Sequence, residues 1–331
     1  MLGASTLRLS RRSLLTRATF GAAFSLASPL ARAQAYPARP VKIIVGFGPG
    51  GAPDIAARLM AQWLTERLGQ PFVVEIRSGA GSNIATEAVA NAAPDGYTLL
   101  LGGLPNAINA TLYSKLNFNF IRDVAPVAGV ISTVNLLLVN PSTPVNSIAE
   151  LIAYARANPG KLNMASAGIG SAPHLTGELF KIMAGIDMVH VPYRAAGAAL
   201  TDLLAGQVQV LFLSMLASIE HVRAGKLRAL AVTTATRFEH LPAIPAVAEF
   251  VPGFEATTWW GIGVPQHTPA DIVQLLNREI NAALADPKMK ARFADEGATV
   301  LRGSPADFGK LIADETEKWG KVVRAANIKA E

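Results

Sequence analysis

A glycine-rich segment, VGFGPGGAPD at residues 45–54, follows an apolar run and precedes a helical pattern. Gly46, Gly48 and Gly51 have the G-x-G-x-x-G spacing that binds the pyrophosphate of a dinucleotide at a helix N-terminus. Glu75, in the next apolar run, lies roughly where such a fold places the acid that contacts the ribose. An exported nicotinamide-dependent oxidoreductase is therefore one hypothesis for this chain.

Three features of the sequence weigh against a dinucleotide. Pro49 stiffens the turn that the pyrophosphate would approach, and Asp54 puts a negative charge in the first helical turn, where phosphate would lie. A second segment, GSAPH at residues 170–174, matches GGAPD at residues 50–54 but lacks the glycine fingerprint. The repeated loop predicts a use common to both halves of the chain.

Glycine-rich backbone at a helix start exposes several N–H donors to an anion. A carboxylate that accepts such donors gains about 1.5–3 kcal/mol per hydrogen bond. Three or four bonds suffice for micromolar affinity, about 8 kcal/mol. The alternative is structural: the glycines only permit a tight turn, and Asp54 complements the helix dipole. Four glycines exceed what one turn needs, which favours anion binding.

Catalytic and metal-binding patterns are absent from the sequence. The histidines have no metal-ligand spacing; they are His174, His190, His221, His240 and His267. There is no G-x-S-x-G motif, and no Gly-Lys pair is followed by Ser or Thr as a P-loop requires. Ser171 and His174 are more typical of a helix cap than of a nucleophile and its base. We therefore expect no enzyme, no cofactor and no metal.

The N-terminal residues have the order of an export signal. Arg11 and Arg12 precede a mildly apolar stretch at residues 18–30, and two overlapping A-x-A sites follow. This order is typical of a signal peptide at residues 1–35, and the arginine pair indicates the twin-arginine route. The apolar part is shorter than the roughly 20 residues that cross a bilayer. We predict cleavage after Ala33 or Ala35 and a periplasmic mature protein.

Most of the net positive charge of the chain lies in this predicted signal peptide. The formal charge of +6 includes five arginines and no acid within residues 1–35, so the remaining 25 basic and 24 acidic residues leave +1. Nucleic-acid binding therefore gains no support from charge. Cysteine is absent, which excludes disulfides and thiolate metal sites.

Short apolar runs alternate with helical patterns in both halves of the chain. The expected strands are residues 41–45, 72–76, 98–101, 162–165, 188–193 and 208–213. This alternation predicts an α/β fold with parallel sheets and helices on both faces. Ligands of such sheets bind beyond the carboxyl ends of the strands, so both loops should face one cleft.

Two similar crossing segments predict two domains. NLLLVN at residues 135–140 and WWGIGV at residues 259–264 each lead through a proline-rich turn into a helix. They imply a discontinuous first domain, residues 36–136 plus 258–331, and an inserted second domain, residues 137–257, joined by a two-stranded hinge. We expect one of Trp259 and Trp260 to pack in the core and the other to form the floor of the cleft. Tyr193 and Arg194 end a strand on the cleft side, where Arg194 either pairs with a ligand carboxylate or is a solvated strand end.

Longer motifs resemble the Bug family, the solute receptors of tripartite tricarboxylate transporters. They are YPARPVKIIV at residues 36–45, PDGYTLL at 94–100, VPYR at 191–194 and DLLAGQVQ at 202–209. The likeness extends from Tyr36 to the C-terminal helices. It implies a two-domain periplasmic binding protein of the type II, Venus-flytrap class, with two crossing strands and no cofactor.

The resemblance also implies a ligand and partners. A small carboxylate would be held by the loops at residues 47–54 and 170–174 and delivered to membrane permease subunits; a membrane sensor kinase is the alternative partner. We expect a monomer. The predicted ligand-binding residues are Phe47, Gly48, Gly50, Gly51, Ala52, Asp54, Asn106, Gly170, Ser171, Ala172, His174, Tyr193, Arg194 and Trp260.

The sequence departs from the family pattern beside the cleft. Pro53 replaces a threonine whose hydroxyl would contact the ligand, and Gln209 and Ser214 stand where many relatives carry aspartate. Fewer acids disfavour a ligand with an amino group. The sequence therefore predicts a plain or aromatic carboxylate.

Overall fold

The computed structural model describes residues 36–330. The chain divides into residues 1–38 and a compact unit, residues 39–331, to which the sheets described below belong. The predicted signal peptide and its cleavage sites at Ala33 and Ala35 lie outside the described residues. None of the helices within residues 36–330 combines the length and the hydropathy of a membrane span.

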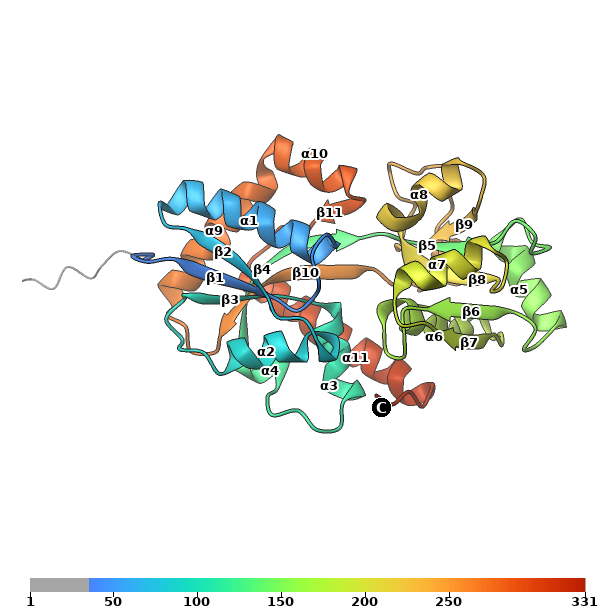
Figure 1. The fold of residues 1–331 in the computed structure, drawn as a ribbon, viewed down its shortest axis with the longest axis horizontal. Coiled ribbons are helices and arrows are strands. Elements are labelled where there is room, and N and C mark those ends of the chain that lie inside the picture. The colour runs from blue at the N-terminus through green and yellow to red at the C-terminus, as the bar shows by residue number, and fades with distance from the viewer. Residues whose placement is uncertain (1–35, 331) are drawn as a thin grey trace, which may run out of the picture. The chain divides into compact units, whose positions relative to one another are not determined.

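The larger sheet has six strands in the order β11-β4-β10-β3-β1-β2 (Figure 1). Its strands are β1 (Val41–Val45), β2 (Phe72–Ile76), β3 (Thr98–Gly103), β4 (Val124–Thr133), β10 (Thr258–Pro265) and β11 (Ala298–Val300). β1 pairs in parallel with β2 and β3, whereas β10 runs antiparallel to β3 and β4. The predicted parallel pairing of β1, β2 and β3 is confirmed, and the crossing strand adds the antiparallel neighbours.

The smaller sheet has five strands in the order β7-β6-β8-β5-β9. Its strands are β5 (Asn135–Val139), β6 (Asn163–Ser166), β7 (Val189–Pro192), β8 (Val210–Ser214) and β9 (Arg228–Val232). β6 is parallel to β7 and β8, and the crossing strand β5 is antiparallel to β8 and β9. Both sheets are therefore mixed.

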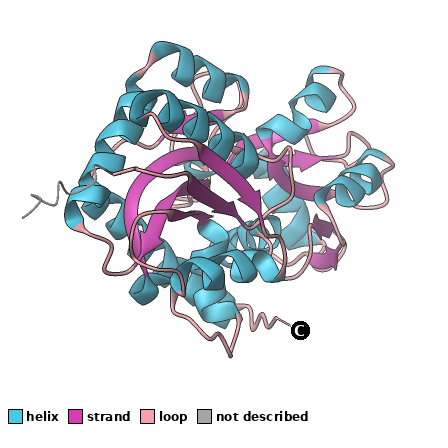
Figure 2. Cartoon of the chain, turned by 60° about the vertical axis from the view of Figure 1, so that its left-hand side comes forward, coloured by secondary structure: helices cyan, strands magenta, loops and turns pink. Residues whose placement is uncertain are grey.

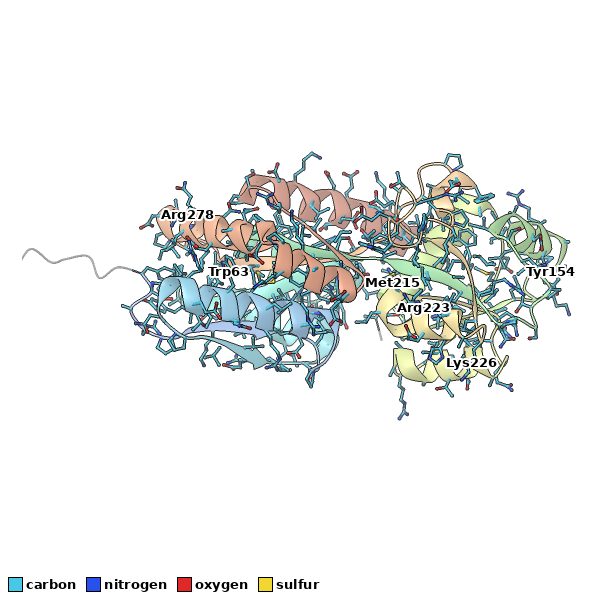
Figure 3. The ribbon with its side chains drawn as sticks, turned by 90° about the horizontal axis from the view of Figure 1, so that it is seen from above. Trp63, Tyr154, Met215, Arg223, Lys226 and Arg278 are labelled. Carbon is cyan, nitrogen blue, oxygen red and sulfur yellow. The ribbon has the colours of Figure 1, made fainter. Side chains whose placement is uncertain are left out.

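Helices cover both faces of each sheet (Figures 1 and 2). Around the larger sheet they are α1 (Ala52–Leu68), α2 (Asn83–Ala90), α3 (Leu104–Leu112), α4 (Phe120–Asp123), α9 (Ala270–Ala285), α10 (Pro287–Asp295) and α11 (Pro305–Ala325). Around the smaller sheet they are α5 (Ile148–Ala157), α6 (Ala172–Ala184), α7 (Ala196–Leu204) and α8 (Met215–Arg223), and short 3₁₀ turns lie at Ala80–Ser82 and Val247–Glu249. α1 and α9 lie side by side (Figure 3), and Arg67 Nε contacts Glu279 Oε2 at 3.1 Å between them.

The strand β5 shows why its sequence is continuously apolar. Leu137 and Val139 pack with α5 and α6, whereas Leu136 and Leu138 pack with α7 and α8 on the opposite face. Successive strand residues point to opposite faces, so a strand covered on both faces needs apolar side chains throughout.

The helices α1 and α6 are built on the same local plan. Each begins with proline in its first turn, where the missing N–H costs no helical bond. Each ends at a glycine in the left-handed region, Gly69 at φ 72° and Gly185 at φ 62°. The repeat in sequence is therefore a repeat of strand, loop and helix, one in each sheet.

Side chains tie the two crossings together. Thr133 Oγ1 donates to Thr258 O at 3.0 Å, and Asn135 Nδ2 donates to Ala256 O at 3.4 Å. β5 begins at Asn135, just before the predicted boundary at 136/137, and β10 begins at the predicted boundary of 257/258. The division into two domains stays a prediction, since residues 39–331 form one compact unit by their contacts.

Candidate functional site

A cavity of about 500 Å³ is lined by segments of both sheets. The larger sheet and its helices contribute Phe47, Gly51, Pro53, Gly81, Pro105, Asn109, Leu112 and Tyr113, and the smaller sheet contributes Ala167, Ile169, Gly170, Ser171 and Ala172. Thr258 and Trp260, on the crossing strand β10, complete the lining. The loops after β1 and after β6 therefore share one cavity.

The first loop is held by Asp54, in the first turn of α1. The Gly50 N–H donates to Asp54 Oδ2 at 2.9 Å, and Arg58 Nε lies 2.9 Å from Oδ1 as an ion pair. Burial raises the pKa of Asp54, but Arg58 and the Gly50 N–H together hold that pKa below its usual value. Asp54 is therefore a charged, internally neutralised support for the loop, and it does not line the cavity.

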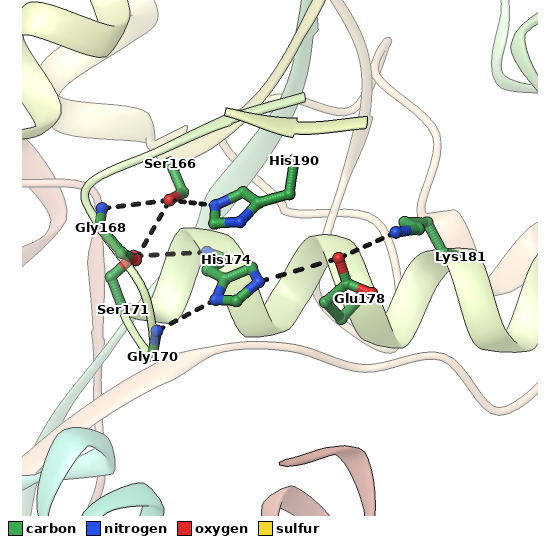
Figure 4. Close-up of polar contacts among 8 residues, drawn as sticks. All are labelled: Ser166, Gly168, Gly170, Ser171, His174, Glu178, Lys181 and His190. Carbon is green, nitrogen blue, oxygen red and sulfur yellow. Dashed lines mark hydrogen bonds and ion pairs between the residues drawn. The ribbon is translucent and has the colours of Figure 1, made fainter. Parts of the chain in front are cut away.

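The second loop is held in the same way by His174, in the first turn of α6. The Gly170 N–H donates to His174 Nδ1 at 3.0 Å, again over a spacing of four residues (Figure 4). Nδ1 can accept only when it carries no proton, so the ring is neutral with its proton on Nε2. Burial, then the neighbouring His190 and Lys181, lower the pKa of His174 to about 3.

A second imidazole extends this support. His190 on β7 stacks on His174 with ring centroids 3.7 Å apart and planes within 8°. Its Nε2 lies 2.7 Å from Ser166 Oγ, which also accepts the Gly168 N–H at 3.1 Å (Figure 4). Burial, and then Lys181, lower the pKa of His190 to about 4. Two neutral rings therefore hold the loop from both ends.

Ser171 caps α6, as the sequence predicted. Its Oγ accepts the His174 N–H at 3.5 Å and donates to Gly168 O at 2.7 Å. The His174 ring bonds to the Gly170 amide and not to this hydroxyl. The pair is therefore not arranged as a nucleophile and base.

Six of the predicted residues line the cavity: Phe47, Gly51, Gly170, Ser171, Ala172 and Trp260. Of the two tryptophans, Trp259 packs edge-on against Phe308 in the core, and Trp260 lies at the cavity edge-on to Phe47, with centroids 5.2 Å apart. Gly48 and Ala52 belong to the first loop but are outside the lining, and Gly50 directs its N–H to Asp54.

Three other predicted residues lie away from the lining. Asn106 is buried, where its Oδ1 accepts the Gly103 N–H at 2.8 Å at the start of α3. Tyr193 donates its hydroxyl to Asp202 at 2.6 Å, a bond that raises the pKa of Tyr193 to about 12. Arg194 is exposed. Direct ligand contact by these three stays a prediction, and Asn106 and Tyr193 already have internal partners.

Several lining residues were not predicted. Gly81 and Pro105 follow the carboxyl ends of β2 and β3, so the rule that ligands bind there could have found them. Leu112 and Tyr113 carry no such signal, because they lie at the far end of α3 and reach the cavity only through the direction of that helix.

The geometry does not favour a dinucleotide. Asp54 occupies the helix N-terminus with its own charge. Glu75, the candidate ribose ligand, is ion-paired with Lys42 at 2.9 Å and with Arg77 at 2.6 Å.

Two α/β sheets joined by crossing strands around a shared cavity define a bilobal solute-binding protein. The family model for the tripartite tricarboxylate transporter family receptor, TctC, matches residues 56–328. The chain therefore belongs to this family of solute-binding receptors, and the resemblance found in the sequence is confirmed.

Close relatives cover nearly the whole chain. Protein BugT of Bordetella pertussis is 40% identical over 96% of this chain and 98% of its own length. The R. palustris protein Rpa4515, solved with adipate, is 38% identical with a TM-score of 0.79, covering 89% of this chain and 99% of its own. MatC of Rhodopseudomonas palustris, solved with bound malate, is 33% identical with a TM-score of 0.75, covering 87% and 100%.

Proposed function

We propose that this protein binds a small carboxylate in the cavity shared by its two sheets and delivers it to membrane permease subunits. The observation that carries the proposal is that both repeated loops line the same cavity. Similar proteins solved with adipate and with malate support a carboxylate as the ligand class.

Backbone donors at two helix starts would hold the carboxylate. The first turn of a helix leaves N–H groups without an acceptor inside the helix, and its positive dipole end attracts anions. Gly51 immediately precedes α1 and Ala172 begins α6, and both line the cavity. Three or four bonds of about 1.5–3 kcal/mol each would suffice for micromolar binding without a cationic side chain.

Delivery requires the protein to be in the periplasm. We propose that residues 1–35 direct export by the twin-arginine route and are removed after Ala33 or Ala35, and that the mature protein is a monomer. N-terminal sequencing of protein from the periplasmic fraction tests the cleavage, and a start at Met1 would contradict it. Loss of labelled-ligand uptake on deleting the receptor tests delivery to a permease.

Gly51→Val tests the loop. Gly51 has an extended φ of −86°, and a Cβ there would meet only Pro53 Cδ, at 3.6 Å. The fold should therefore tolerate valine, while its methyl groups enter the cavity and should abolish binding of a carboxylate that binds the wild type. Gly48→Val is the matched control, because Gly48 has open space around it and does not line the cavity.

A thermal-shift screen of mono-, di- and tricarboxylates and aromatic acids identifies the ligand for that comparison, and calorimetry gives the affinities. If Gly51→Val binds as tightly as wild type, the first loop has no part in binding. If no carboxylate in the screen binds the wild type, the proposed function fails.

A further inference from the structure

We infer that the ligand is a monocarboxylate with an apolar, aromatic body. This inference rests on the proposed function and narrows it. The cavity lining offers one place for an anion and a largely apolar remainder.

No formal charge lines the cavity. None of its fifteen residues is Asp, Glu, Lys, Arg or His. The two loop supports lie outside the lining and have partners of their own: Asp54 is ion-paired with Arg58, and His174 is the neutral acceptor of the Gly170 N–H. A second carboxylate on the ligand would therefore find no cation among the lining residues.

Asn109 and Ser171, two of the polar side chains of the lining, already donate to the protein. Asn109 Nδ2 donates to Gly81 O and to Asn83 Oδ1, both at 2.8 Å. Ser171 Oγ donates to Gly168 O. Thr258 Oγ1 accepts Asn135 Nδ2 at 3.4 Å and keeps its O–H to donate, Tyr113 has the other hydroxyl at the cavity, and Trp260 Nε1 is buried without a hydrogen-bond partner. These few neutral donors, with no cation among the lining residues, are weak partners for a whole second carboxylate, whose burial without a counter-charge is costly.

Apolar side chains from the larger and the smaller sheet, with their helices and loops, form the rest of the cavity lining. Phe47 and Trp260 meet edge to face, with an interplanar angle of 78°. Leu112 approaches the opposite loop so closely that a Cβ at Gly170 would lie 2.2 Å from its Cδ2. Ile169 is 43% exposed although it lines the cavity, so it presents apolar surface to an occupant. Aromatic and aliphatic walls with a few fixed polar groups are typical of sites for apolar ligands.

The charge and the shape of the lining select the same ligand class. The two helix starts supply backbone donors for one carboxylate, and the rings and aliphatic side chains contact an apolar body. A flexible dicarboxylate would have to keep its second charge at the solvent-exposed mouth.

Calorimetry at pH 7.5 tests the selection with two sets of probes. The aromatic monocarboxylates are benzoate, phenylacetate and 3-phenylpropionate; the others are succinate, adipate and citrate. We expect the best aromatic acid to bind at least about tenfold more tightly than the best di- or tricarboxylate, a difference of about 1.4 kcal/mol. Equal or tighter binding of adipate would overturn the inference and leave the proposed function standing.

The uncharged amide benzamide separates the two proposals. If benzamide binds as tightly as benzoate, no anion site exists and the proposed function fails. Failure of all three aromatic acids to bind, while another carboxylate of the wider screen does bind, would overturn the inference alone.

A charge placed in the wall gives an independent readout. Ile169→Lys adds a cation at an exposed position of the lining and should raise the affinity for adipate about tenfold relative to that for the aromatic acid. Ile182→Lys is the matched control, because Ile182 is 48% exposed on α6, beside the same sheet, but does not line the cavity. If the two variants shift adipate affinity equally, the cavity does not set the charge preference and the inference fails.

Discussion

The stacked histidines predict that this protein loses stability in mild acid. The pKa of His174 is lowered to about 3 and that of His190 to about 4, whereas unfolded imidazoles titrate near pH 6.5. Between these values the unfolded chain binds protons that the native protein does not. The free energy of unfolding should therefore be fully present above about pH 6.5 and fall as the pH drops toward 4.

The size of this loss follows from the two shifts. Each imidazole that titrates only in the unfolded chain lowers the free energy of unfolding by about 1.4 kcal/mol per pH unit. Two rings over the two units from pH 6.5 to 4.5 give at most about 5 kcal/mol. Glu178, 3.8 Å from His174 Nε2, favours protonation, whereas Lys181 opposes it; both line a second cavity beside the two rings, as does Lys329. We expect a loss of roughly 2–5 kcal/mol, a large part of a typical domain's stability.

Urea unfolding between pH 7.5 and 4.5 measures this loss, and His174→Asn isolates one ring. The asparagine Oδ1 can accept the Gly170 N–H as Asp54 accepts that of Gly50, so the loop keeps its support. The variant should lose about 1.4 kcal/mol less per pH unit than wild type. His240→Asn, at an exposed position, controls for removing a histidine. Parallel pH profiles for wild type and His174→Asn would refute a neutral, buried His174.

Ligand affinity should respond only at lower pH than stability does, because the ring of native His174 stays neutral until the pH approaches its pKa of about 3. Protonating His174 at Nδ1 removes the acceptor of the Gly170 N–H, and a cation there faces His190 across 3.7 Å. The loop that lines the cavity would then lose its support. Binding by the folded wild type should therefore be nearly equal at pH 7.5 and 4.5, and a weakening at pH 4.5 that His174→Asn does not show would contradict the low pKa of His174.

Further variants test the remaining supports of the site. Asp54→Ala leaves the Gly50 N–H without its acceptor and should cost about 1–3 kcal/mol in urea unfolding and weaken binding, whereas Asp54→Asn should recover most of both. Gly170→Val forces a β-branched residue to φ +74° and against Leu112, so we expect loss of binding by calorimetry and a lowered Tm. Asn106→Ala removes the acceptor of the Gly103 N–H at the start of α3 and should cost about 1–3 kcal/mol in urea unfolding. The ligand affinity should be retained if Asn106 makes no ligand contact.

The sequence predicted the features of the site that depend on residues close together in the chain. The alignment of GGAPD with GSAPH located both loops. The last residue of each motif, Asp54 in the first and His174 in the second, accepts the backbone N–H of the glycine four residues before it. It could not predict the role of His190, which depends on the parallel pairing of β6 and β7 that places it opposite Met164 and beside the first turn of α6. Nor could it predict the apolar wall from Leu112, since long-range packing sets the direction of α3.

The two loops are held by side chains of different charge, and this difference bears on the ligand. Each needs an acceptor for one inward-pointing N–H at a helix start. In the first loop that acceptor is a carboxylate, and Arg58 neutralises it. In the second it is an imidazole kept neutral by burial beside a second ring. Asp54 is neutralised by its ion pair and His174 is uncharged, and no charged residue lines the cavity, so the backbone dipoles of the helix starts are what attracts an anion there. Such dipoles suit one anionic group, because each additional carboxylate would need counter-charge that the lining does not provide.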